Sequence, residues 1–251
     1  MTYGYGFGSR ARRRGVIAGG SGPPLPTYLE VENFENGDQI FTAGSPALPP
    51  PAGTEPGDLL VAVVTRKGGV AAPSTPTGWT LIDHWLFGPA TSAGARVSLF
   101  WRIAPDPVPA SWTFTISGVY AYGRIFGFRN FDETDPIGTS IVHDTLSIPD
   151  TGDQSETMLA VQTDTPNAMS LLFVVANLAG AFTWQDPDPV YTGIGSATWT
   201  ENFVAFRWWR RLRQQPGDQG TVEVKFNNGS SVNNNRTLGA VRISISAAED
   251  E

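Results

Sequence analysis

The fold is decided by residues 57–64, which read Gly-Asp-Leu-Leu-Val-Ala-Val-Val. Six consecutive apolar residues of strand length, rich in valine, are typical of a β-strand that is buried on both faces. The same kind of run recurs at residues 171–176, which read Leu-Leu-Phe-Val-Val-Ala. These two stretches predict two central strands of an all-β protein and leave no place for a nucleotide-binding fold.

Each buried run is followed by the same series of segments: an aromatic–arginine strand, a strictly alternating strand and a closing strand. In the first half these are residues 99–102, 112–116 and 123–129, and in the second half they are residues 207–210, 222–226 and 239–245. The series predicts an antiparallel, jelly-roll-like β-sandwich over residues 27–248 with two pseudo-repeated halves, about 27–140 and 141–248. Residues 1–26 precede it as a flexible N-terminal arm.

Individual positions follow from this pattern. Trp101 and Trp209 are predicted to occupy equivalent core positions, and Arg102 and Arg210 to stack over neighbouring aromatic rings. Alternation over residues 111–117 places Trp112, Phe114 and Ile116 on a buried face. Alternation over residues 241–246 puts Val241, Ile243 and Ile245 inside and Arg242, Ser244 and Ser246 on a solvated face. Residues 44–53 are predicted to be a proline-rich loop without strand pairing.

Composition excludes several classes of function. The chain has 251 residues, of which 16% are charged, with 28 Gly, 20 Pro and 8 Trp, as expected for many short strands joined by turns around an aromatic core. The absence of cysteine excludes disulfides, thiolate metal sites and cysteine nucleophiles. No apolar run approaches the roughly 20 residues of a membrane helix, so we expect no membrane insertion. No targeting signal is recognised, because the apolar stretch after Arg14 ends at Gly19–Gly20.

Charge is distributed unevenly along the chain. Residues 1–29 carry four arginines and no acid, whereas the rest carries 13 basic and 24 acidic residues, a net charge of −11. A basic arm on an acidic body predicts docking onto an acidic surface, such as that of another copy, and argues against nucleic-acid binding by the body. The predicted attachment residues of the arm are Tyr3, Tyr5, Phe7, Arg10, Arg12, Arg13 and Arg14. The alternative is that this arm is a disordered tail.

Signals of catalysis are weak. His84 and His143 are far apart in sequence and show no metal-binding spacing. The acidic clusters at residues 132–135 and 186–188 lie beside proline in turn contexts, which favours acidic turn residues over a pair of hydrolytic carboxylates. We therefore predict no enzyme activity, no catalytic residue, no cofactor and no metal site.

Aromatic residues near predicted loops support a second hypothesis. Exposed rings of this kind can stack on sugars, which would make the protein a carbohydrate-binding or adhesin module that contacts a host-surface glycan. The candidate stacking residues are Trp85, Tyr120, Tyr122, Trp184 and Trp199. The competing interpretation is that these rings fill the core.

Several segments of the first half also resemble a known family. They are Gly57–Leu60, Gly78–Ile82, Leu99–Arg102, Trp112–Thr115 with Ser117–Gly118, and Phe128–Phe131 closing on Asp135–Ile137. Over residues 57–137 the chain resembles β-sandwich structural proteins of tailed bacteriophages and phage-derived particles such as gene transfer agents, which serve as tail, fibre, spike or head-decorating components. The resemblance implies a virion protein, assembled in the host cytoplasm, that forms homo-oligomers and joins capsid, portal or tail proteins.

Overall fold

The computed structural model describes residues 29–37, 40–67, 73–87, 95–116, 120–138, 142–147, 152–158, 162–163, 165–177, 182–185, 192–199, 204–212, 217–218, 222–228 and 237–250. In the second half, the described side chains are those of residues 165–175, 210–211 and 241–250. The described part of the chain is all-β, with antiparallel sheets and no helix, which confirms the all-β prediction. No helix in that part is long and apolar enough to cross a membrane.

The first sheet has six strands in the order β1-β8-β4-β6-β5, and β2 pairs with β8 beside β1. These strands are β1 (Glu32–Asn36), β2 (Ile40–Thr42), β4 (Leu59–Lys67), β5 (Thr80–Phe87), β6 (Ala95–Ile103) and β8 (Tyr120–Arg129). A short pair, β3 (Ala47–Leu48) with β7 (Trp112–Thr113), lies outside it. Because β3 falls within residues 44–53, the prediction of a loop without strand pairing was wrong there.

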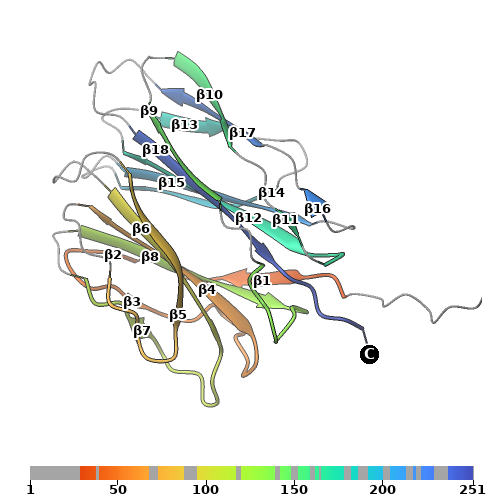
Figure 1. Cartoon of the computed structure of the whole chain (residues 1–251). Helices are drawn as coiled ribbons and strands as arrows, with labels where there is room; N and C mark the ends of the chain where they lie inside the picture. The colour runs from red at the N-terminus through yellow and green to blue at the C-terminus, as the bar shows by residue number, and fades with distance from the viewer. Residues whose placement is uncertain are drawn as a thin grey trace, which may run out of the picture.

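The second sheet has five strands in the order β14-β15-β12-β18-β9. These are β9 (Val142–Ser147), β12 (Met169–Asn177), β14 (Thr192–Trp199), β15 (Val204–Leu212) and β18 (Thr237–Ile245). Two small sheets accompany it, one of β10 (Gly152–Met158), β17 (Val222–Asn228) and β13 (Phe182–Gln185), and one of β11 (Gln162–Thr163) with β16 (Gly217–Asp218). Figure 1 shows the first and second sheets facing each other, with β10, β13 and β17 beyond the second sheet.

Strand pairing is nested in both halves of the chain. In the first half β2 pairs with β8, β3 with β7 and β4 with β6. In the second half β9 pairs with β18, β10 with β17, β11 with β16 and β12 with β15. Each half is therefore an antiparallel ribbon folded back on itself, and β4–β8 and β12–β18 pairing closes each large sheet.

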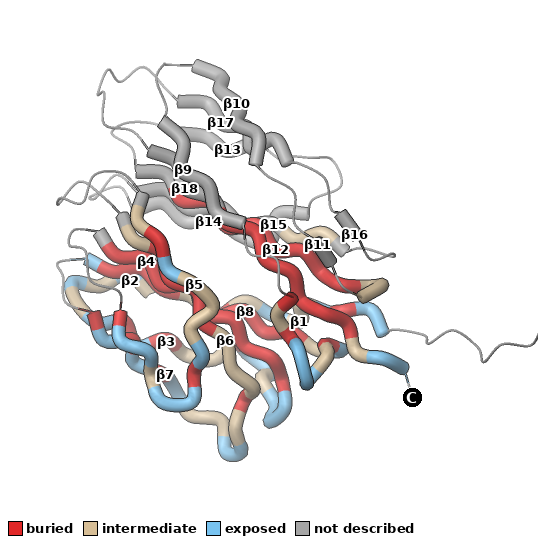
Figure 2. The backbone as a smooth tube through the Cα atoms, viewed as in Figure 1, coloured by how far each residue is buried: buried red, intermediate tan, exposed pale blue. Residues whose placement is uncertain are grey.

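Strand β4 is buried on both faces, as its sequence predicts. Leu59, Val61 and Val63 face a core that both large sheets share, which we call the shared core. Leu60, Ala62 and Val64 lie in a separate cluster on the opposite face, the outer core. Figure 2 shows burial along most of the described length of β4, β8 and β12.

The shared core is built from apolar side chains of both sheets. From the second sheet it includes Met169, Leu171, Phe173, Val175, Val241, Ile243 and Ile245. Phe126 of β8 lies across from Phe173 of β12, with ring centroids 5.5 Å apart. The backbone also joins the halves, since Phe131 forms a bridge with Ala247 and Ile137 with Ile245. The two large sheets are therefore packed together, and the segment after β8 is hydrogen-bonded to the end of β18 and the residues that follow it.

Arg242, Ser244 and Ser246 are buried, each 3% exposed or less, so the predicted solvated face of β18 was wrong. Alternation along β18 is real, because Val241, Ile243 and Ile245 lie in the shared core. The other face is covered as well, which sequence alternation alone cannot reveal.

The prediction that Trp101 and Trp209 occupy equivalent positions was also wrong, because the strand pairing of Trp209 is displaced by one residue relative to that of Trp101. Trp101 pairs with Val61 and packs against the shared core, half-buried rather than fully enclosed. In the second sheet the residue that pairs with the shared-core residue Leu171 is Arg210, whereas Trp209 pairs with Leu172. A shift of one residue moves a side chain to the other face of a strand, so similar sequence motifs acquire different surroundings.

Candidate functional site

The seven attachment residues predicted in the arm, Tyr3, Tyr5, Phe7, Arg10, Arg12, Arg13 and Arg14, lie outside the described residues. The attachment hypothesis therefore stays a prediction.

The aromatic residues proposed to stack on sugars have different surroundings. Trp85 and Tyr122 are buried in the shared core, with 6% and 1% of their surface exposed, so their rings offer no stacking surface. Trp85 pairs with Val97, which is also in that core, and burial raises the pKa of the Tyr122 hydroxyl. Tyr120, at the start of β8, is exposed. Trp184 and Trp199 belong to β13 and β14, where side chains lie outside the description.

Groups considered for catalysis lie on different elements of the fold. His84 is exposed on β5 of the first sheet, whereas His143 belongs to β9 of the second. The Asp132 carboxylate accepts the backbone N–H groups of Thr134 and Asp135 at 2.8 and 3.3 Å, which is the turn role predicted for that cluster. Asp186 and Asp188 lie outside the described residues. No group of three or more His, Asp or Glu in the described residues could hold a metal ion.

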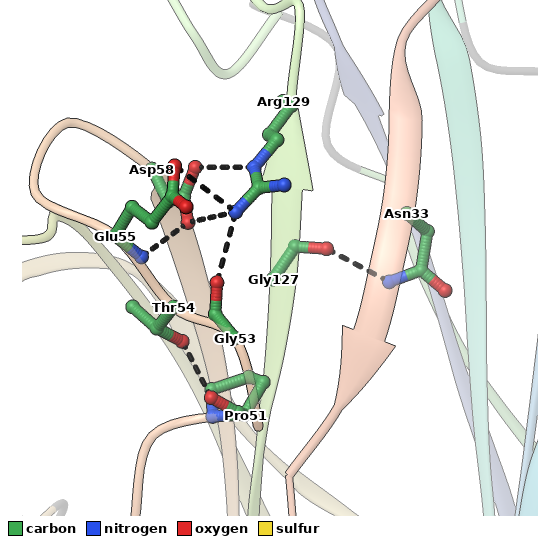
Figure 3. Close-up of polar contacts among 8 residues, drawn as sticks. All are labelled: Asn33, Pro51, Gly53, Thr54, Glu55, Asp58, Gly127 and Arg129. Carbon is green, nitrogen blue, oxygen red and sulfur yellow. Dashed lines mark hydrogen bonds and ion pairs between the residues drawn. The ribbon is translucent and has the colours of Figure 1, made fainter.

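The best-defined polar cluster ties the loop before β4 to the end of β8 (Figure 3). The Arg129 guanidinium donates to both carboxylate oxygens of Asp58, at 2.8 and 3.2 Å, and to the carbonyl of Gly53 at 2.9 Å. Asp58 is 6% exposed and also accepts the backbone N–H of Glu55 at 2.7 Å. The Glu55 carboxylate lies farther from Arg129, at 3.6 Å, and is largely exposed.

This cluster, which we call the loop anchor, is electrostatically satisfied. The hydrogen bond that Arg129 donates to Asp58 is the main cause that raises the pKa of Arg129, so the guanidinium stays charged. Its carbon lies 4.3 Å from the centroid of the Phe34 ring, which adds a cation–π contact with β1. A methyl group at Gly127 would lie 2.4 Å from that ring, so any larger residue there would displace Phe34 from Arg129. The anchor fixes the loop and has no unpaired group for chemistry.

A cavity of about 370 Å³ lies beside the anchored loop. It is lined by Glu35, Asn36, Gly37, Pro50 and Ala52. Gly37 donates its N–H to the Ile125 carbonyl at 2.7 Å, which holds the end of β1 close to β8. Because the lining combines one carboxylate and one amide with proline and alanine, it can accept a small polar group. It contains no aromatic ring for a sugar and no nucleophile.

On the outer face of the first sheet, Arg102 is stacked as predicted. Its guanidinium carbon lies 5.6 Å from the Trp79 ring and 5.1 Å from the Trp112 ring. The two indoles meet edge to face, with centroids 5.5 Å apart. Burial lowers the pKa of Arg102 from its ordinary value. Arg210 donates a hydrogen bond to the Asn33 carbonyl at 3.1 Å. The side chains beside it at residues 204–209 lie outside the described residues, so its stacking on an aromatic ring stays a prediction.

Sequence reasoning missed the loop anchor and the cavity. Asp58 and Arg129 are 71 positions apart, and neither residue belongs to a motif that predicts the other. The Asn36–Gly37 dipeptide was the one local signal for a sharp change of direction beside the cavity.

No family model, curated protein or solved structure matches this chain.

Proposed function

We propose that this chain is a non-enzymatic structural protein of a phage-like particle. In this proposal it decorates or extends a head or tail, and the arm attaches it to capsid, portal or tail proteins. The observation that carries the proposal is the nested pairing of strands in both halves around one shared core. Ribbons rolled in this way are the topology of jelly rolls, which are common in viral capsid and lectin domains.

We infer from the same pairing that the body is a jelly-roll-like β-sandwich with two pseudo-repeated halves. The order β5-β6-β4-β8 in the first sheet corresponds to β14-β15-β12-β18 in the second. Both orders begin with an edge strand, β5 or β14. In both, the third strand, β4 or β12, is the one that is buried on both faces. A rigid body of this kind suits a protein whose role is to present or join surfaces.

The use of polar groups in the described residues supports a structural role. Asp58 and Arg129 tie a loop to a strand, and Asp132 organises a turn. Arg124 likewise donates to the Gly37 carbonyl at 2.7 Å, which joins β8 to the β1–β2 connection. These charged side chains stabilise the architecture, and their geometry offers no acid–base pair for catalysis.

Attachment can be tested with particles that lack the native chain. Protein lacking residues 1–22 should remain folded but fail to co-sediment with these particles, because the arm carries the concentrated positive charge. Replacement of Arg10, Arg12, Arg13 and Arg14 by Ser should weaken attachment in a salt-sensitive manner, and replacement by Lys, the matched control, should retain it. Full incorporation of the truncated protein would overturn attachment through the arm.

The alternative function is glycan binding at a host surface. Among the candidate stacking residues whose side chains are described, Tyr120 is the one with an exposed ring. Lectin domains also use jelly rolls, so the fold is compatible with this alternative. Two measurements together decide between the proposals. A glycan array shows whether the protein binds a glycan, and mass spectrometry of purified particles shows whether the protein is part of them. Selective glycan retention that Tyr120→Ala abolishes, together with absence from particles, would favour the alternative.

A further inference from the structure

Two arginines face each other near one end of the first sheet. Arg66 of β4 pairs directly with Arg96 of β6, and Leu86 of β5 pairs with Arg96 on the other side. Arg66 is 5% exposed, whereas Arg96 is half-buried and reaches solvent. Directly paired residues share a face of the sheet, and like charges at such positions repel each other. Burial, and then the charge of Arg96, lower the pKa of Arg66.

Donor atoms beside this pair have no acceptor in the described structure. The Nε of Arg96 and the hydroxyl of Ser98 are buried and lack a hydrogen-bond partner among the described residues. Ser98 is fully buried and lies two residues from Arg96 on the same strand, so both point to the same face. Buried polar groups are normally satisfied, so an unpaired donor pair indicates a missing acceptor.

Acidic residues are concentrated at the opposite end of the first sheet. Residues 68–79, which connect β4 to β5, residues 88–94, which connect β5 to β6, and residues 117–119, which precede β8, contain no Asp or Glu. Segments 43–48 and 111–116, which include β3 and β7, also lack acids. By contrast, Glu55 and Asp58 precede β4, Asp106 follows β6, and Asp132, Glu133 and Asp135 follow β8. None of the segments that lack acids therefore supplies a carboxylate to Arg96.

We propose that Arg66, Arg96 and Ser98 form a binding site for a small oxyanion of the phosphate or sulfate class. Guanidinium groups donate several N–H bonds in a planar fork that fits such oxygens, and the serine hydroxyl adds another donor. The anion also neutralises the repulsion between the arginines. Ligands enter from the side of Arg96, which is the partly exposed member. This site does not depend on the proposed structural function.

The test uses the full chain and follows the side-chain Nε–H resonance of Arg96 by NMR. Inorganic phosphate or sulfate at low millimolar concentration should shift this resonance in a saturable manner, and sodium chloride at the same ionic strength should not. Arg96→Gln lacks this resonance, so its binding is measured by the sulfate-dependent melting temperature, and it should be about tenfold weaker or more, as expected for loss of charge-assisted hydrogen bonds. Methyl phosphate distinguishes a free ion from a phosphate group that is part of a larger molecule. If it binds as tightly as inorganic phosphate, the site accepts a phosphate carried on a larger molecule. If it binds more weakly, the ligand is the free ion.

Arg124→Gln is the matched control, because the Arg124 guanidinium donates to the backbone carbonyls of Gly37 and Asn36. The increase in melting temperature caused by sulfate, relative to chloride, should be kept in Arg124→Gln and mostly lost in Arg96→Gln. The variants are needed because sulfate also stabilises proteins in general. Without added oxyanion, Arg96→Gln should not lower the melting temperature, since it removes a like-charge contact. Equal sulfate effects in all three proteins, or no saturable shift at Arg96, would overturn the site.

Discussion

The two large sheets have the same strand order, but corresponding residues have different surroundings. In the first sheet Trp101 packs against the shared core and Arg102 stacks on the outer face over Trp79 and Trp112. In the second sheet Arg210 takes the position beside a shared-core residue and donates to the carbonyl of Asn33. The comparison teaches that topology is repeated between the halves while register is not, and register decides which side chains meet.

The largest effect is expected where the two sheets meet. Phe126→Ala should lower the free energy of unfolding by about 3–5 kcal/mol, because it removes a fully buried ring that contacts Phe173. Phe41→Ala is the control, since Phe41 is 38% exposed on β2, and it should cost about 1 kcal/mol or less. Urea denaturation measures both. Equal costs would mean that the sheets do not depend on this contact.

A smaller effect is expected at the loop anchor, which the first sheet has at the start of β4. Asp58→Asn should cost about 1.5–3 kcal/mol, because a buried carboxylate loses its charge-assisted bonds with Arg129. Glu55→Gln, at the exposed and longer contact, should cost about 0–0.5 kcal/mol. A double-mutant cycle of Asp58→Asn with Arg129→Gln isolates the pair, and a coupling energy of zero would refute the anchor.

The smallest effect on stability is expected from replacing Arg102, and it distinguishes Arg102 from Arg210. Arg102→Met should cost about 0.5–1 kcal/mol, because it removes a half-exposed cation–π stack while it keeps an aliphatic chain. It should also shift the indole N–H resonances of Trp79 and Trp112. Arg210→Met should leave both resonances in place, since Arg210 lies on the face toward the shared core. Identical spectra for the two variants would contradict the difference in register.

Local patterns predicted the strands well. The doubly apolar run in β4 is buried on both faces, and burial alternates from Trp112 to Ile116. Strand pairing in that last segment is nevertheless limited to Trp112–Thr113, and beyond it Phe114 donates its backbone N–H to Pro46 while the Thr115 carbonyl accepts from Ser74. Periodicity reports which residues avoid water, and it does not report which backbone groups find a partner strand.

Contacts between distant segments could not be predicted. Burial of Arg242 requires that the second face of β18 be covered, and alternation with polar residues predicts the opposite. The Asp58–Arg129 pair depends on β4 lying beside β8, which follows from the nested pairing and from no local motif. Trp85 was proposed for sugar stacking because it is near a predicted loop, but its register with Val97 directs it into the core.

The central claim is that one shared core makes the two large sheets a single cooperative unit. Native-state hydrogen exchange of the amides of Val61 in β4 and Phe173 in β12 tests it most directly. We predict opening free energies that agree within about 0.5 kcal/mol and that fall together, by about 3–5 kcal/mol, in Phe126→Ala. Clearly different opening free energies, with the amide of Phe173 unaffected by Phe126→Ala, would show that the sheets unfold independently and would contradict the account.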